Sequence, residues 1–98
     1  MIDIDFSIKG GAVTFDDFFI KEGVPLDCQL DDLKEDMLQV KFHGGYIFDV
    51  GWRPSFEVDG KFYVVLIENY NWDNPIYSGT AKSLCELKDK ITEALSLI

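Results

Sequence analysis

Apolar and polar residues alternate strictly over residues 2–9, at the start of the chain. The apolar positions of this stretch are Ile2, Ile4, Phe6 and Ile8. A period of two is typical of a strand with one solvated face, so we predict a strand over residues 2–9. Gly10-Gly11 is expected to end it.

A second alternating region predicts a hairpin within residues 38–53. A loop of three residues, 43–45, would pair Phe42 with Tyr46, Val40 with Phe48 and Leu38 with Val50. A two-residue turn at Gly44-Gly45 would instead set apolar positions opposite polar ones. Because only the first register keeps the apolar side chains on one face, we predict the three-residue loop.

Further strands are predicted in the second half of the chain. Pro54 should end the strand before it. Residues 56–58 and 62–67 are β-rich and are joined by Asp59-Gly60, which is a strong hairpin signal. Residues 62–67 are apolar on both faces, which indicates a central strand that is covered on both sides or that contacts a partner on one side. Residues 76–81 are expected to form a short strand.

One helix is predicted clearly, at the end of the chain. Ser83 and Glu86 form a capping box, and Glu86 and Lys90 are spaced for an i, i+4 ion pair. The following apolar positions fall at helical spacing, so that one stripe should pack on the sheet: Leu84, Leu87, Ile91, Ala94, Leu95 and Ile98.

Two segments before the hairpins have weaker signals. Thr14 and Asp17 favour a short helix over residues 14–22, closed by Gly23, although the three phenylalanines there also suit a strand. Residues 26–37 are acidic and turn-like, with at most one helical turn within residues 31–36. Together these elements predict an α+β fold for a single domain of residues 1–98: an antiparallel sheet of about five strands with the C-terminal helix on one face.

The chain is strongly acidic, with a net charge of −9 at pH 7. Residues 1–36 contain ten acids and three lysines, a net charge of −7. Such a protein repels phosphate backbones, so direct nucleic-acid binding is not expected. Acidity of this size attracts basic partners, although it also serves solubility alone.

Other features set the expected compartment and exclude several kinds of site. There is no signal-peptide pattern at the start, and the longest apolar run is far shorter than a membrane span. Cys28 and Cys85 lie far apart with no CxxC spacing, as is typical of reduced thiols. We therefore expect a cytoplasmic protein with no membrane partner, no structural or catalytic metal and no cofactor.

The sequence offers little for catalysis. His43 is the only histidine and falls in the predicted hairpin loop, and no nucleophile or phosphate-binding motif occurs. Asn69, Asn71 and Asp73 match the first positions of a calcium loop, but Asn74 and Thr80 stand where that loop needs Gly and Glu. We predict that the protein is not an enzyme, and a small-molecule ligand is not expected.

Acidic residues and aromatic residues are the best candidates for partner binding. Interfaces favour aromatic anchors with charged residues around them. The turn after residue 68 supplies two aromatics beside a dense acidic segment. The candidate partner-binding residues are Asp27, Asp31, Asp32, Glu35, Asp36, Tyr70 and Trp72.

Residues 35–77 resemble small immunity proteins encoded beside bacterial polymorphic and contact-dependent growth inhibition toxins. The resemblance rests on the "LQV…YIFDVGW.P.F" strand pair, the "DG" hairpin and the "W.NP" turn. It implies a single small domain that binds the C-terminal toxin domain of a neighbour's effector and blocks it without chemistry. The class has no shared binding motif, so no residue roles carry over.

The resemblance and the acidity together predict an immunity protein for a cognate toxin domain. Many such toxins are basic nucleases, which suit a net charge of −9. The alternative is a small enzyme or a regulatory domain that binds a small molecule. A co-encoded upstream toxin would favour the first reading, and a concave pocket around His43 would favour the second.

Overall fold

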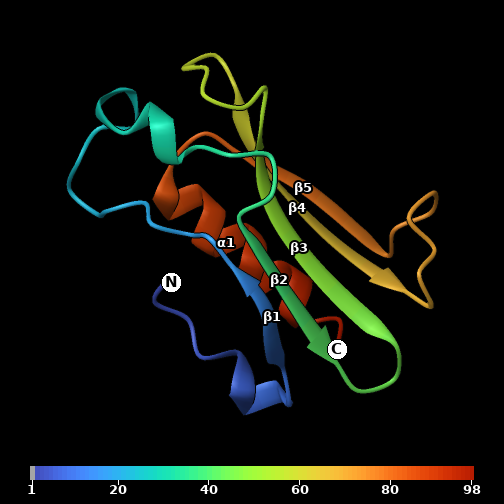
Figure 1. Cartoon of the computed structure of the whole chain (residues 1–98). Helices are drawn as coiled ribbons and strands as arrows, with labels where there is room; N and C mark the ends of the chain where they lie inside the picture. Colours follow the sequence, from blue (N-terminus) through green and yellow to red (C-terminus); the bar gives the residue numbers. More distant parts are fainter. Residues whose placement is uncertain (1) are drawn as a thin grey trace.

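A computed structural model describes residues 2–98 and shows the predicted α+β architecture (Figure 1). The strands are β1 (Ala12–Asp16), β2 (Leu38–Phe42), β3 (Tyr46–Arg53), β4 (Lys61–Glu68) and β5 (Tyr77–Ala81). They form one antiparallel sheet in the order β1-β2-β3-β4-β5. The helix α1 (Leu84–Leu95) packs on β4 and β5.

One face of the sheet carries the core. Phe48, Val50 and Trp52 of β3 stand opposite Leu66, Val64 and Phe62 of β4, and all six side chains are buried. The apolar stripe of α1 covers part of this face through Leu87, Ile91 and Ala94. Residues from the N-terminal third of the chain cover the rest, with the rings of Phe6 and Phe48 5.6 Å apart and those of Phe18 and Phe62 6.4 Å apart.

The β2–β3 hairpin has the predicted register. Phe42 pairs with Tyr46, Val40 with Phe48 and Leu38 with Val50. Gly44 and Gly45 both have positive φ angles of 84° and 80°, which the three-residue loop requires and glycine allows. Burial of one apolar face therefore determined the register, as expected.

The predicted strand over residues 2–9 is wrong. A 3-10 helix, η1 (Phe6–Lys9), forms there, with the Asp5 carboxylate accepting a hydrogen bond from the Ser7 N–H. Ile2 and Phe6 are buried, whereas Ile8 is 81% exposed. The alternation is real only as far as Phe6, because the side-chain cap at Asp5 favours a local turn over a strand.

Residues 14–22 form no helix. Residues 14–16 belong to β1, and the remainder is irregular. The Thr14 hydroxyl donates to the Gln39 carbonyl on β2 rather than capping a helix, and the Asp17 N–H donates to the Met37 carbonyl. Pairing of residues 12–16 with β2 satisfies their backbone groups better than a short, weakly capped helix would.

The predicted Asp59-Gly60 hairpin is also wrong. Residues 56–58 are not a strand, and β4 pairs with β3 directly, with Arg53 opposite Lys61. The Gly60 N–H donates to the Glu57 carbonyl, so the Asp-Gly pair closes a turn inside the loop of residues 54–60. The turn signal was real, but Pro54 and this turn belong to one longer connection.

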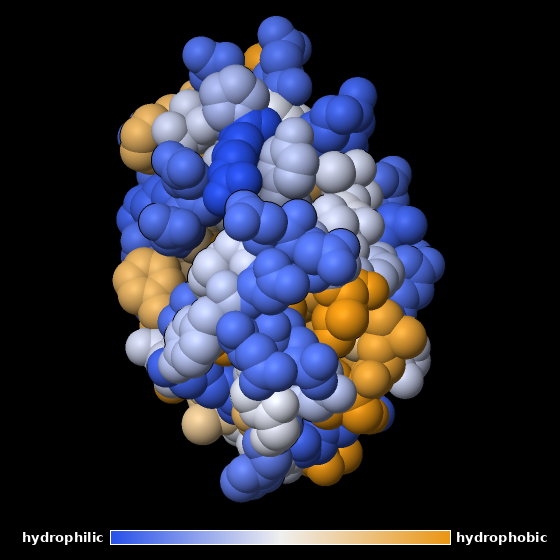
Figure 2. All heavy atoms as spheres, turned by 90° about the vertical axis from the view of Figure 1, so that its right-hand side faces the viewer, coloured by the Kyte–Doolittle hydropathy of each residue, from blue (hydrophilic) through white to orange (hydrophobic). Residues whose placement is uncertain are grey.

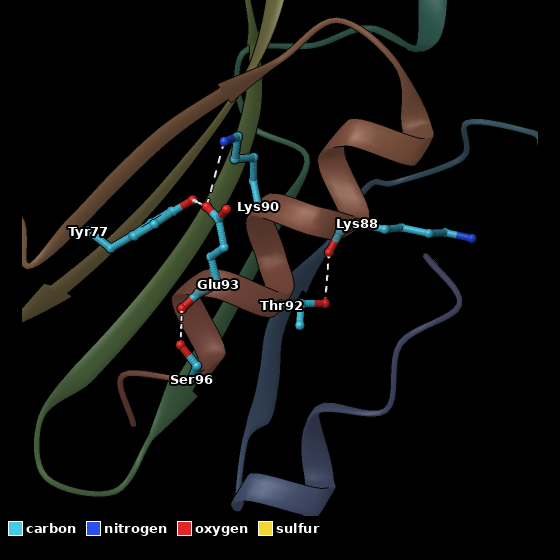
Figure 3. Close-up of polar contacts among 6 residues, drawn as sticks. All are labelled: Tyr77, Lys88, Lys90, Thr92, Glu93 and Ser96. Atoms are coloured by element: carbon cyan, nitrogen blue, oxygen red, sulfur yellow. Dashed lines mark hydrogen bonds and ion pairs between the residues drawn. The ribbon is translucent and has the colours of Figure 1, made fainter.

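The C-terminal helix follows its prediction with small differences. The Ser83 hydroxyl accepts a hydrogen bond from the Glu86 N–H at 3.1 Å. The Glu86 carboxylate accepts from the Lys82 N–H rather than from Ser83, and Lys90 lies 3.6 Å from Glu93 instead of pairing with Glu86. Figure 3 shows this side of α1, where the Tyr77 hydroxyl on β5 donates to Glu93 at 2.5 Å.

Candidate functional site

The acidic segment after residue 25 is held by two buried side chains. It contains two short 3-10 turns, η2 (Leu26–Cys28) and η3 (Leu30–Asp32), in place of the single turn expected at residues 31–36. The buried Gln29 amide bonds to the Lys21 N–H and to the carbonyls of Lys21 and Val24. With Leu33 fully buried, the carboxylates of this segment are held outward on a fixed backbone.

The segment then runs along the end of β3. The Trp52 N–H donates to the Lys34 carbonyl at 2.8 Å, and the Met37 N–H donates to the Val50 carbonyl at 2.9 Å. Between these two bonds the main chain of Glu35 lies directly on Gly51, where an added Cβ would be 1.8 Å from the Glu35 carbonyl oxygen. Glu35 and Asp36 are exposed here, and Glu35 lies 3.7 Å from Arg53.

The loop of residues 54–60 brings a second set of exposed side chains to the same place. Phe56 is 53% exposed and Val58 is 57% exposed, while Glu57 and Asp59 add two carboxylates. The Phe56 N–H donates to the Leu33 carbonyl, which joins this loop to the acidic segment. The sequence did not predict this surface, because residues 56–58 were expected to form a strand.

We call this surface the acidic end. Figure 1 shows its two segments together at the top of the sheet. The residues that define it are Asp27, Asp31, Asp32, Glu35, Asp36, Phe56, Glu57, Val58 and Asp59. All are exposed except Asp32, which is half-buried. Of the basic residues nearby, Lys34 pairs with Asp17 at 2.9 Å and Arg53 pairs with Glu35.

The predicted aromatic anchors lie elsewhere. Tyr70 is 67% exposed and Trp72 is 46% exposed, both in the β4–β5 loop. The Asn69 N–H donates to the Gly45 carbonyl, which fixes this loop at the start of β3, whereas the acidic end lies where β3 finishes. The eight residues of β3 span about 23 Å, so the expected joint surface of carboxylates and these two aromatics does not form.

Figure 2 shows the side of the molecule on which the β4–β5 loop lies in Figure 1. This side is mostly hydrophilic, with a hydrophobic area toward one edge.

The Lys41 ammonium lies 5.9 Å from the centre of the Tyr70 ring. Since Trp72 is half-exposed, it is not the core tryptophan of the fold; that position belongs to Trp52, which is 2% exposed.

A groove of about 570 Å³ runs through the acidic end. Leu26 and Asp27 form one side and residues 58–60 the other, with Trp52 and Lys82 also contributing. A second groove, of about 520 Å³, lies between residues 21–26 and the start of α1. Its lining includes Lys21, Lys82 and Lys88, but Lys88 is paired with Glu22. The two grooves meet at Leu26 and Lys82.

Asp49 on β3 lies on the sheet face opposite the core and has a raised pKa. Burial raises the pKa of its carboxyl, and the nearby Asp36 charge adds to that shift. A hydrogen bond to the Gln39 side chain and the charge of Arg53 act in the opposite direction. A half-buried carboxyl of this kind marks functional sites in some proteins, but structural networks produce it too.

Residues 2–98 contain no group of three or more His, Cys, Asp or Glu side chains arranged to hold a metal ion. Both cysteines are exposed and free. Over the same residues, no helix combines the length and the apolar character needed to cross a membrane. No family model, curated protein or solved structure matches this chain.

Proposed function

We propose that this protein is a cytoplasmic immunity protein, which binds a basic toxin domain and covers its active site without chemistry. The observation that carries the proposal is the acidic end, where two separate segments bring seven carboxylates together with the exposed Phe56 and Val58. The resemblance of residues 35–77 to immunity proteins points to the same function.

The charge of the acidic end suits a nuclease as the target. A nuclease active site is electropositive because it holds phosphates, so an acidic protein surface competes for the same place. Exposed carboxylates mainly raise the association rate, whereas an apolar side chain buried on binding mainly lengthens the lifetime of the complex.

The acidic end is also rigid enough for tight binding. Main-chain hydrogen bonds join Lys34 and Met37 to β3 and join Phe56 to Leu33. Because these segments are already ordered in the free protein, binding would lose little conformational entropy. Inhibition by occlusion needs such a preformed surface and no catalytic group.

The test uses the protein encoded immediately upstream of this chain, which the proposal expects to contain the toxin domain. Co-expression should restore growth to cells that produce that domain, and the purified proteins should form a complex. Neutralising Asp31, Asp32, Glu35 and Asp36 together should slow association at low salt, with a smaller loss at high salt. Association as fast as that of the parent at low salt would disprove the electrostatic mechanism.

Two variants at the opposite end of the sheet provide the control. Tyr70→Ala and Trp72→Ala change exposed aromatic side chains in the loop at the start of β3, whereas the acidic end lies where β3 finishes. If the acidic end is the binding surface, both should bind the toxin domain like the parent. A dissociation rate raised about 30-fold in Trp72→Ala would instead place an anchor in the β4–β5 loop.

A further inference from the structure

We infer that the groove between η2 and residues 58–60 accepts one arginine or lysine side chain of the partner protein. This inference rests on the proposed function and names the contact that would fix the partner's position. The groove has carboxylates on both sides, Asp27 and Asp59, and both residues are exposed. Its apolar lining comes from Leu26, Val58 and Trp52.

This lining matches the two parts of a long basic side chain. Methylene groups of lysine and arginine pack on apolar surface while the charged head stays with polar groups. In the groove, Leu26 and Val58 would contact the methylene groups, and the carboxylates of Asp27 and Asp59 would bind the charged head. Guanidinium suits this site best, because its planar donors can serve two carboxylates at once.

The loop that forms one side of the groove is held in place through Trp52 and Leu33. The indole Nε1–H of Trp52 donates to the Glu57 carbonyl at 2.8 Å, and the Phe56 N–H donates to the Leu33 carbonyl at 2.8 Å. Gly60 lies so close to Trp52 that an added Cβ would be 2.3 Å from Nε1. The side of the groove formed by residues 58–60 is therefore fixed before binding, which favours a specific side-chain pocket.

Substitution of Lys82 tests whether the group that binds in the groove is a cation. It lines the same groove, and its ammonium forms no ion pair within residues 2–98. An incoming arginine or lysine would meet its like charge, so Lys82 opposes a cation and would favour an anion. Removing the ammonium should therefore strengthen binding of a basic side chain.

The test compares two variants that change the net charge equally. Asp27→Asn/Asp59→Asn removes the carboxylates of the groove, whereas Asp73→Asn/Asp89→Asn removes two exposed carboxylates that do not line it. Each shifts the net charge from −9 to −7. Binding to the toxin domain encoded upstream is measured by surface plasmon resonance, with thermal melting as a check that each variant is folded.

The expected result is a Kd about 30-fold higher for the groove variant, mainly through faster dissociation, because the bound side chain would bury Asp27 and Asp59 in the complex. The control variant should lose only a little association rate, and Lys82→Ala should bind at least as tightly as the parent. A double-mutant cycle between Asp59 and each surface arginine and lysine of the toxin domain should find one strongly coupled residue.

Four results would overturn the inference. Equal effects of the two double variants would show that only total charge matters, and weaker binding by Lys82→Ala would exclude a cation in the groove. Failure of the parent itself to bind would disprove the proposed function and this inference with it. Concentration-dependent dimerisation of the free protein that is lost in the groove variant would show instead that a second copy occupies the groove.

Discussion

The main-chain N–H of Phe56 donates a 2.8 Å hydrogen bond to the carbonyl oxygen of Leu33. This bond connects residues 23 positions apart and holds the two acidic segments side by side. Phe56 has a φ angle of 64°, in the left-handed region that bulky residues rarely adopt. An exposed phenylalanine is thus held at a backbone position that glycine would favour.

Two substitutions of Phe56 should distinguish its effect on folding stability from its effect on partner binding. Phe56→Gly should be more stable than Phe56→Ala by about 1 kcal/mol, because only glycine adopts a positive φ angle without a steric cost. Urea unfolding measures the difference. Both variants lose the ring, so both should dissociate faster from the toxin domain; dissociation at the parent's rate would remove Phe56 from the binding surface.

Gly51→Ala should disrupt the acidic end. The new Cβ would lie 1.8 Å from the Glu35 carbonyl oxygen, which is a backbone atom and cannot turn aside like a side chain. We expect a loss of about 3 kcal/mol or more in the free energy of unfolding, measured with urea. Ser78→Ala, at an exposed position on β5, is the matched control and should change stability little. Equal stability of both variants would contradict the packing of Glu35 on Gly51.

Asp49→Asn should stabilise the protein at neutral pH. Burial raises the pKa of the Asp49 carboxyl above its ordinary value of 3.8, so the folded state holds its proton more tightly than the unfolded state does. Stability from this group is therefore complete below pH 3.8 and is lost as the pH rises through the folded-state pKa. Thermal melting across this range should show that Asp49→Asn is more stable than the parent only above the folded-state pKa of Asp49. An equal gain in stability below pH 3.8 would show that the gain does not come from ionisation of Asp49.

Tyr77→Phe should abolish a loss of stability that the parent protein shows at alkaline pH. Burial and the hydrogen bond to Glu93 raise the pKa of Tyr77 from 10.0 to about 12. Since the unfolded phenol ionises first, the parent should lose stability as the pH rises from 10.0 to about 12. Melting of the parent and of Tyr77→Phe over this interval tests the difference, and a phenol that titrates at its ordinary pKa by ultraviolet absorbance would contradict it.

Much of the sheet was predictable from local pattern. The alternation in residues 38–53 determined the β2–β3 register because any slip by one residue would expose the apolar face. The capping serine at residue 83 and the apolar stripe after it determined α1. Both signals lie within one continuous segment, so they can be read without knowledge of the rest of the fold. These elements depend on contacts between neighbours in the sequence.

The structure of other segments depended on which strands pair in the folded protein. Residues 2–9 alternate like a strand, yet the sheet gives them no pairing partner, and they cover the core as an irregular segment with η1. Residues 56–58 are β-rich, but β4 pairs with β3 and leaves them in a loop. β-propensity describes a fit to a pleated surface, so it has no effect where no neighbouring strand is available.

The sequence by itself determined the α+β class, the central hairpin, the C-terminal helix and the net charge of −9. Only the tertiary structure decided where that charge gathers. It placed residues 54–60 beside the acidic segment and put Tyr70 and Trp72 at the far end of β3. A binding surface joins residues distant in the chain, and their proximity follows from strand pairing and main-chain hydrogen bonds that no single segment contains.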